Sequence, residues 1–138
     1  MTNPLVTIIT PCYNGEAFLD KYFASILAQT YDRLELIFVN DGSTDRTEEI
    51  ALSYRQALED RGIVFKYLYQ PNGGQAKAMN TGFREMTGKY LVWPDSDDLL
   101  SPDSIEKRAA FWMPILSMDS FGPTAIFSAL KRESEPVR

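Results

Sequence analysis

The sequence of 138 residues contains no histidine and only one cysteine, Cys12. Without histidine the chain cannot by itself supply a Ser-His-Asp or Cys-His catalytic system. A single cysteine can form neither an internal disulfide nor a cysteine-rich zinc site, which is typical of a protein kept in a reducing compartment. We expect Cys12 to be a small packing residue, and any bound metal ion to be held by oxygen ligands.

Excess positive charge and long apolar runs are also missing. The net formal charge is -5, which disfavours binding to nucleic acid or to an anionic membrane. No run approaches the ~20 apolar residues of a membrane span, and residues 1–11 lack the pattern of a secretory signal. These features predict a cytoplasmic domain, with any attachment to the cytoplasmic face of a membrane made through regions outside this chain.

Short apolar runs alternate along the chain with stretches of helical periodicity. Five runs predict strands, the first of them stopped by Pro11, at 5–9, 34–39, 64–69, 90–93 and 124–130. Apolar residues at helical spacing predict helices at 19–27, 45–61, 75–86 and 101–116. Continuously apolar strands separated by helices predict a three-layer α/β/α fold with a mainly parallel sheet. Residues 1–130 would form this domain and 131–138 a charged tail.

Four polar segments follow the predicted strands directly. They are Pro11–Glu16, Asn40–Ser43, Pro71–Gln75 and Asp95–Asp98. In a parallel sheet the carboxyl ends of the strands meet at one edge, where ligands of α/β proteins bind. The sequence therefore predicts that these four loops converge on a ligand site.

The acidic loop contains Asp95, Asp97 and Asp98 within four residues. Carboxylates this close repel one another, and a hard divalent cation such as Mg²⁺ or Mn²⁺ would offset the repulsion while bridging to phosphates. The alternative is that they are solvated turn residues that precede the helix start at Ser101-Pro102. Their position directly after an apolar strand favours the metal.

Other metal and phosphate motifs are incomplete. Asp95, Asp97, Asp103 and Glu106 fit four positions of a calcium-binding EF-hand, but Leu99 and Leu100 stand where that loop needs an oxygen ligand and a glycine. The turn at Asn40 lacks the nucleophilic Asp of a haloacid-dehalogenase-like phosphatase. Neither a P-loop nor a Gly-x-Gly-x-x-Gly motif occurs, which disfavours kinases, GTPases and dinucleotide-dependent dehydrogenases.

Three further side chains allow both a binding and a structural interpretation. Asp41 could accept an N–H of a base or bind a ribose, or it could stabilise its own turn beside Gly42. Tyr13 could stack on a nucleobase, or be a partly buried loop aromatic. Lys77 could meet a phosphate at the start of a helix, beside Asn72 and Gln75, or be a solvated helix residue.

Taken in order, these loops resemble the nucleotide-sugar-binding half of family 2 glycosyltransferases of the GT-A fold. Four segments carry the resemblance, namely Val6–Asn14, Val39–Asp45, Asn72–Gly82 and Asp95–Asp98. Each segment alone is a weak signal, and their order and separations make the resemblance specific.

The resemblance implies binding of a nucleotide-sugar donor, with UDP as the nucleotide. It assigns donor contacts to Pro11, Tyr13, Asn14, Glu16, Asp41, Asn72, Gln75, Lys77, Asp95 and Asp97. It also implies that Asp97 and Asp98 hold Mg²⁺ or Mn²⁺, with Asp95 either a ligand or a support for the loop. The cation would neutralise the leaving diphosphate as the sugar departs.

The chain departs from the family pattern in two places. Met79 stands where many relatives carry arginine, and nothing after Phe121 resembles the region that binds the acceptor and supplies the general base of an inverting transfer. The base is therefore expected beyond Arg138, and the glycan, lipid or protein acceptor is not identified. Two hypotheses follow: the donor-binding part of a transferase, or a truncated module that binds nucleotide without transfer. An incomplete sheet would also favour self-association.

Overall fold

The computed structural model describes residues 4–93 and 100–107. Within them four parallel strands form one sheet in the order β3-β2-β1-β4. The strands are β1 (Val6–Cys12), β2 (Leu34–Asp41), β3 (Val64–Gln70) and β4 (Tyr90–Val92). The predicted strand at 124–130, the tail at 131–138 and the acidic residues Asp95, Asp97 and Asp98 lie outside the described residues.

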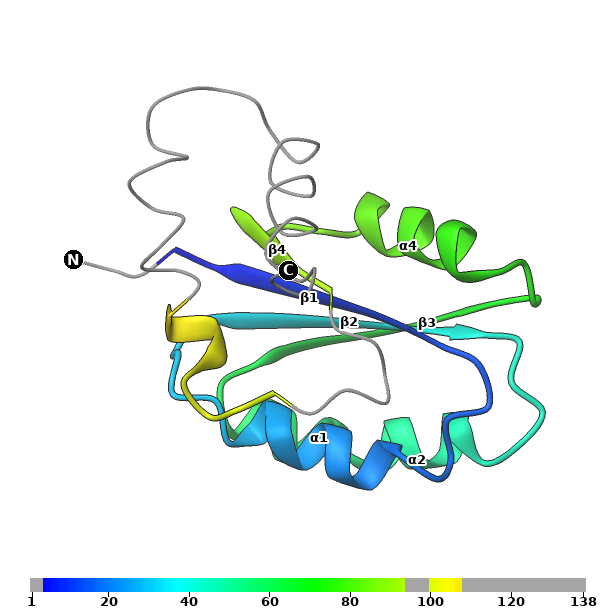
Figure 1. The fold of residues 1–138 in the computed structure, drawn as a ribbon, viewed down its shortest axis with the longest axis horizontal. Coiled ribbons are helices and arrows are strands. Elements are labelled where there is room, and N and C mark those ends of the chain that lie inside the picture. Colours follow the sequence, from blue (N-terminus) through cyan, green and yellow to red (C-terminus); the bar gives the residue numbers. More distant parts are fainter. Residues whose placement is uncertain (1–3, 94–99, 108–138) are drawn as a thin grey trace, which may run out of the picture.

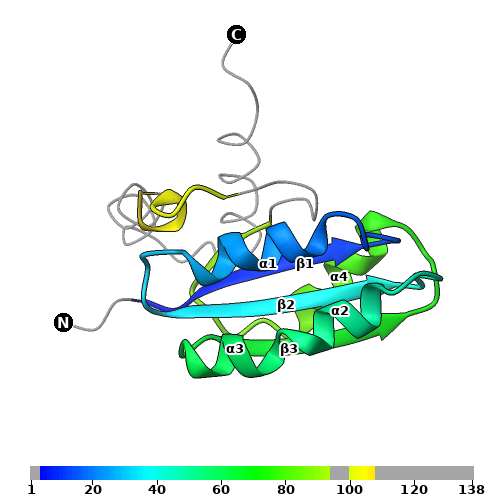
Figure 2. The same ribbon diagram turned by 90° about the horizontal axis from the view of Figure 1, so that it is seen from below.

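Helices cover both faces of the sheet, as the sequence predicted. They are α1 (Leu19–Leu27), α2 (Thr47–Ser53), α3 (Arg55–Asp60) and α4 (Gln75–Arg84). Figure 1 shows α4 above the sheet and α1 and α2 below it, and Figure 2 shows α3 beside α2 on that lower face. The fold is therefore a three-layer α/β/α arrangement.

The first strand is longer than predicted, because it continues through Pro11 to Cys12. Within the described residues β4 pairs with Val6–Ile8, and β2 pairs with the whole of β1 up to Cys12. Pro11 is in register with Val39 of β2, so the pairing with β2 continues through the proline although it has no N–H to donate. The prediction that Pro11 stops the strand was therefore wrong.

The second predicted helix is divided at Tyr54 into α2 and α3. The ring of Tyr54 stacks on that of Phe23 at 4.7 Å between centroids, and its backbone N–H bonds to the carbonyl of Ala51 rather than to one four residues earlier. This tighter turn interrupts the α-helical pattern. The helix predicted at 75–86 also ends earlier, at Arg84.

Helix α4 approaches the sheet closely at Gly82. A Cβ atom at this position would lie 2.6 Å from Cγ2 of Ile9 on β1, a distance that real Cβ contacts do not reach. Only a residue without a side chain allows this approach. The contact fixes the height of α4 above β1 and β2 at this point.

A buried carboxylate on β2, Glu35, binds groups from three other parts of the chain. It accepts hydrogen bonds from the hydroxyls of Thr7 and Thr87 and from the Thr87 backbone N–H, and it pairs with Lys66 at 3.0 Å. Burial raises the pKa of Glu35, but the hydrogen bonds from Thr87, Thr7 and Lys66 outweigh it and lower the pKa overall. The cluster fixes the approach to β4, which begins at Tyr90.

Residues 100–107 pack against the end of α1. The side chain of buried Gln29 donates to the Ser101 carbonyl at 2.8 Å and accepts from the Ile105 N–H at 3.2 Å. Thr30 donates its backbone N–H to the Pro102 carbonyl. Residues 104–107 are helical and residues 102–103 form a turn, so the helix predicted at 101–116 begins later than predicted, and its part after residue 107 lies outside the described residues.

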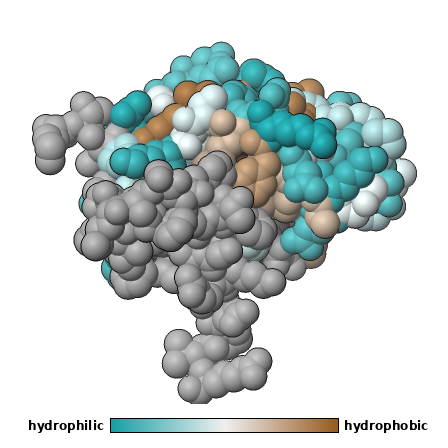
Figure 3. Space-filling model, turned by 90° about the horizontal axis from the view of Figure 1, so that it is seen from above, coloured by the Kyte–Doolittle hydropathy of each residue, from teal (hydrophilic) through white to brown (hydrophobic). Residues whose placement is uncertain are grey.

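In the view from the α4 side, the part of the surface that is coloured by hydropathy is largely hydrophilic, with an apolar area near the middle of the view (Figure 3). Within the described residues, no helix combines the length and the apolar character that crossing a bilayer requires.

Candidate functional site

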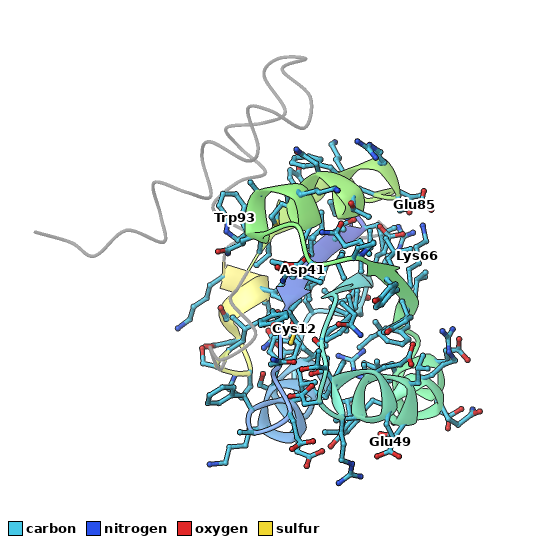
Figure 4. All side chains as sticks on the ribbon, turned by 90° about the vertical axis from the view of Figure 1, so that its right-hand side faces the viewer. Cys12, Asp41, Glu49, Lys66, Glu85 and Trp93 are labelled. Atoms are coloured by element: carbon cyan, nitrogen blue, oxygen red, sulfur yellow. The ribbon has the colours of Figure 1, made fainter. Side chains whose placement is uncertain are left out.

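The carboxyl ends of β1, β2 and β3 lie side by side at one edge of the sheet. Cys12 is in register with Asn40, and Asp41 with Gln70. Figure 4 looks onto this edge and shows Cys12 and Asp41 between α4 on one side and α1 with α2 on the other. The structure thus brings together three of the four predicted loops, and the fourth, Asp95–Asp98, lies outside the residues it describes.

The β1–α1 loop is joined to the β2–α2 loop through Asn14. This residue has a φ of +52°, in the left-handed region that asparagine tolerates better than most residues. Its backbone N–H donates to the Ser43 hydroxyl at 2.9 Å, and its side-chain oxygen accepts from the Thr44 N–H at 2.8 Å. These two bonds hold the strained backbone, which follows directly on Tyr13.

Glu16 faces the start of α2. Its carboxylate accepts the backbone N–H of Arg46 at 3.1 Å, while its own N–H donates to Asp45. Slight burial raises the pKa of Asp45, but hydrogen bonds from Thr47 and from the Glu16 N–H lower it overall. In this structure Glu16 therefore binds the neighbouring loop, whereas the resemblance assigns it a donor contact.

Asp41 ends β2 as a buried carboxylate, 4% exposed, with four hydrogen-bond donors around it. Its Oδ1 accepts from the Gln70 amide at 2.7 Å and from the Gly73 N–H at 2.9 Å. Its Oδ2 accepts from the Asn72 amide at 3.2 Å and from the Gly74 N–H at 3.1 Å. A carboxylate has about four lone-pair sites, so the chain satisfies this buried charge with neutral donors.

The turn after β2 is stabilised by Asn40 rather than by Asp41. The Asn40 side-chain oxygen accepts the Ser43 N–H at 3.0 Å, and its amide donates to the Tyr67 hydroxyl at 2.8 Å. That hydroxyl donates in turn to Glu48 of α2 at 3.0 Å. The Asp41 carboxylate instead binds the loop between β3 and α4.

The other predicted donor-binding residues differ in exposure. Pro11 is buried in β1, and Cys12 is 3% exposed, as expected of a packing residue. Tyr13 is 53% exposed, so about half of the surface of its side chain is accessible to a ligand. Exposed residues at the start of α4 are Asn72, Gln75 and Lys77.

Two residues that bind this constellation, Gln70 and Thr81, were missed by the sequence interpretation. Gln70 is 6% exposed and joins Asp41 to Thr81, whose hydroxyl lies 2.6 Å from the Gln70 side-chain oxygen. The sequence signal that could have identified Gln70 was its position as a polar residue at the end of a mostly apolar strand, directly before Pro71. Its partner Asp41 lies 29 residues earlier, and spacing alone does not reveal such a pair.

A metal site cannot be assembled from the residues that the structure describes. Among residues 4–93 and 100–107, no three histidine, cysteine, aspartate or glutamate side chains come together as a metal-binding group. The predicted ligands Asp97 and Asp98 and the third acidic residue Asp95 are in the undescribed segment.

Comparison with known proteins identifies the class of this fold. The crystal structure of Staphylococcus aureus TarS in complex with UDP matches 78% of this chain with a TM-score of 0.70 and 26% identity, and the chain covers 32% of it. The mannosyltransferase PcManGT of Pyrobaculum calidifontis, in complex with GDP-Man and Mn²⁺, matches 72% at a TM-score of 0.64 and 30% identity, with 29% of it covered. The fold is that of GT-A nucleotide-sugar transferases.

Sequence relatives narrow the class further. The family model of glycosyl transferase family 2 matches residues 7–113, and the chain belongs to this family. An uncharacterized glycosyltransferase of Rickettsia prowazekii is 48% identical over 106 residues, which are 77% of this chain and 31% of the relative. The glycosyltransferase GlyA of Streptococcus pneumoniae is 42% identical over 101 residues, 73% of this chain and 14% of the relative. The chain thus spans a third or less of these two relatives.

Proposed function

We propose that this chain binds the nucleoside diphosphate sugar donor of a glycosyltransferase, with UDP as the nucleotide. Tyr13 and Asp41 would contact the base and ribose, and Asn72, Gln75 and Lys77 the rest of the donor. The observation that supports this most is their convergence on one sheet edge, where Tyr13 is exposed and three loops are joined by hydrogen bonds. The UDP and GDP-Man held by the two structural relatives support it independently.

We further propose that Asp97 and Asp98 bind Mg²⁺ or Mn²⁺ beside this edge, with Asp95 as a ligand or a support. A divalent ion bound there would neutralise charge on the diphosphate leaving group. Hard oxygen donors suit either ion, and the Mn²⁺ in the PcManGT structure supports the proposal. The general base of an inverting transfer would come from a part of the protein beyond Arg138, together with the acceptor site.

Titration of the chain with UDP, with and without Mn²⁺, tests the donor and the metal separately. We expect binding that is tighter with Mn²⁺, and Asp98→Ala to remove the metal-dependent part of the affinity. Asp60→Ala is a matched control, because Asp60 is exposed on α3 and bonds only to Gln56 among the interactions described. An Asp98→Ala variant with unchanged metal-dependent affinity would contradict the metal assignment.

Transfer itself needs a second assay. Hydrolysis of UDP-sugar, or transfer to an added acceptor, separates a chain that turns over donor from one that only binds it. We expect binding with little turnover, since the expected base lies beyond Arg138. Efficient transfer by the purified chain would refute that part of the proposal and leave donor binding intact.

A further inference from the structure

The buried amide of Gln70 connects β2, β3 and α4 behind the sheet edge. Asp41 and Gln70 are partners in register on neighbouring parallel strands, so their side chains project toward the same face of the sheet. The Gln70 amide nitrogen lies 2.7 Å from Asp41 Oδ1, and its oxygen lies 2.6 Å from the Thr81 hydroxyl of α4. A continuous hydrogen-bonded chain therefore runs from α4 to the Asp41 carboxylate.

The carboxylate determines the direction of every bond in this chain. An ionised Asp41 can only accept, so the NH₂ end of the Gln70 amide must face it and the oxygen must face Thr81. Thr81 has one hydroxyl proton and two acceptors within reach, Gln70 at 2.6 Å and the Lys77 carbonyl at 3.0 Å. The fixed amide draws that proton toward Gln70, which makes each bond polarise the next.

Gln70 differs from the other donors to Asp41 in where it is attached. Asn72, Gly73 and Gly74 belong to the loop between β3 and α4, whereas Gln70 is the last residue of the paired strand β3. Since the four acceptor sites of the carboxylate are filled, a nucleoside N–H or O–H that reaches Asp41 must displace or share a loop donor. The strand donor remains and keeps Oδ1 in place.

We propose that Gln70, oriented by Thr81, is the positioning residue that holds Asp41 for recognition of the nucleoside. This deepens the proposed donor binding and rests on it. The role is specific to the nucleoside end of the donor, because Gln70 acts on Asp41 and not on the diphosphate. Its loss therefore weakens UDP more than a ligand that has no nucleoside.

The test compares the affinities of UDP and of inorganic pyrophosphate, both with Mn²⁺, by calorimetry. Gln70→Met keeps the length of the side chain and removes its hydrogen bonds. We expect it to weaken UDP about tenfold, because Asp41 loses the partner that orients it and the loss of such orienting partners costs about tenfold or more in affinity at other ligand sites. We expect the affinity for pyrophosphate to change less than about twofold, because Asp41 does not contact it. Thr81→Val should weaken UDP by a smaller factor, and Thr81→Ser, which keeps the hydroxyl, should restore it.

Gln56→Met is the matched control, because Gln56 makes the same amide-to-carboxylate bond at 2.8 Å, to Asp60, on α3. It should leave both affinities unchanged. A Gln70→Met variant that binds UDP as wild type does, or that loses UDP and pyrophosphate by the same factor, would overturn the positioning role. A wild-type chain that binds no UDP would instead refute the proposed function, on which this role depends.

Discussion

Replacing Glu35 by glutamine tests whether the buried carboxylate cluster stabilises the fold. Glu35 is fully buried on β2, and its two oxygens accept from different groups. Oε1 accepts from the Thr7 hydroxyl at 2.7 Å and the Thr87 N–H at 2.9 Å. Oε2 accepts from the Thr87 hydroxyl at 2.6 Å and pairs with Lys66 at 3.0 Å.

The structure gives the size of the effect. In Glu35→Gln we expect the amide oxygen to take the place of Oε1, where it still accepts from the Thr7 hydroxyl and the Thr87 N–H. The NH₂ group does not fit there, because the backbone N–H of Thr87 can only donate. The NH₂ group then replaces Oε2, where the Thr87 hydroxyl can turn to accept but Lys66 cannot. Lys66 is one third exposed and still reaches water and the Glu85 carbonyl. The bond with Lys66 is lost and the three remaining bonds are no longer made to a charged group, and we expect a net loss of about 2 kcal/mol.

Urea unfolding at neutral pH measures this loss as a lower midpoint with an unchanged slope. Glu59→Gln is the matched control: its pair with Arg55 spans 3.8 Å, both side chains are nearly half exposed, and its loss should change stability by less than about 0.5 kcal/mol. If both variants unfold within about 0.5 kcal/mol of wild type, the buried cluster contributes no more than an exposed ion pair and the reasoning fails.

Three other outcomes follow from the same contacts. The folded-state pKa of Glu35 lies below its usual 4.5, so its contribution to stability is present above that value and is lost as the pH falls through the lowered pKa. The difference in free energy of unfolding between wild type and Glu35→Gln, measured in urea, should therefore decrease from pH 7 to pH 3. A difference that stays constant with pH would contradict this. Gly82→Ala should destabilise by about 1–3 kcal/mol in the same assay, because its Cβ would meet Ile9 at 2.6 Å, and a neutral result would show that α4 can shift. Tyr13→Ala should weaken UDP by about 1–3 kcal/mol if its exposed ring stacks on the base, while Phe18→Ala, also exposed, should not.

Much of the fold could be predicted because parallel strands buried on both faces leave a clear signature. The run at 34–39 falls inside β2, which is buried along its whole length, and its apolar character follows from that burial. The run at 64–69 falls inside β3, at the edge of the described sheet, where Phe65 is buried but Val64 and Tyr69 are exposed. The errors occurred where a tertiary contact overrides a local signal. Pro11 lies in a strand because its pairing with Val39 of β2 continues past the proline. The second helix is interrupted at Tyr54, whose ring stacks on that of Phe23.

The sequence was sufficient to predict which loops form the candidate site, but not which residues form hydrogen bonds within it. Turn residues after apolar strands locate the edge, since every parallel strand ends there. The partners within the edge come from positions 29 to 33 residues apart, as in the four bonds to Asp41. Such pairs depend on the register of β2 against β3, which spacing within one loop does not reveal. For the same reason the hydrogen bond between Glu35 and Thr87, which are 52 residues apart, could not be predicted from the sequence.

The bonds between the loops bear on how the site can bind. Asn14 joins the first loop to the second, and Asp41 joins the end of β2 to the loop before α4. In each of these bonds a side-chain oxygen of one loop or strand end accepts a backbone N–H of another loop. The three loops are therefore bonded to one another as well as to their strands. Binding to loops that are already held loses less conformational entropy. The left-handed backbone of Asn14 is the strained element that this arrangement maintains, and it leaves the neighbouring ring of Tyr13 exposed at the edge where the donor is proposed to bind.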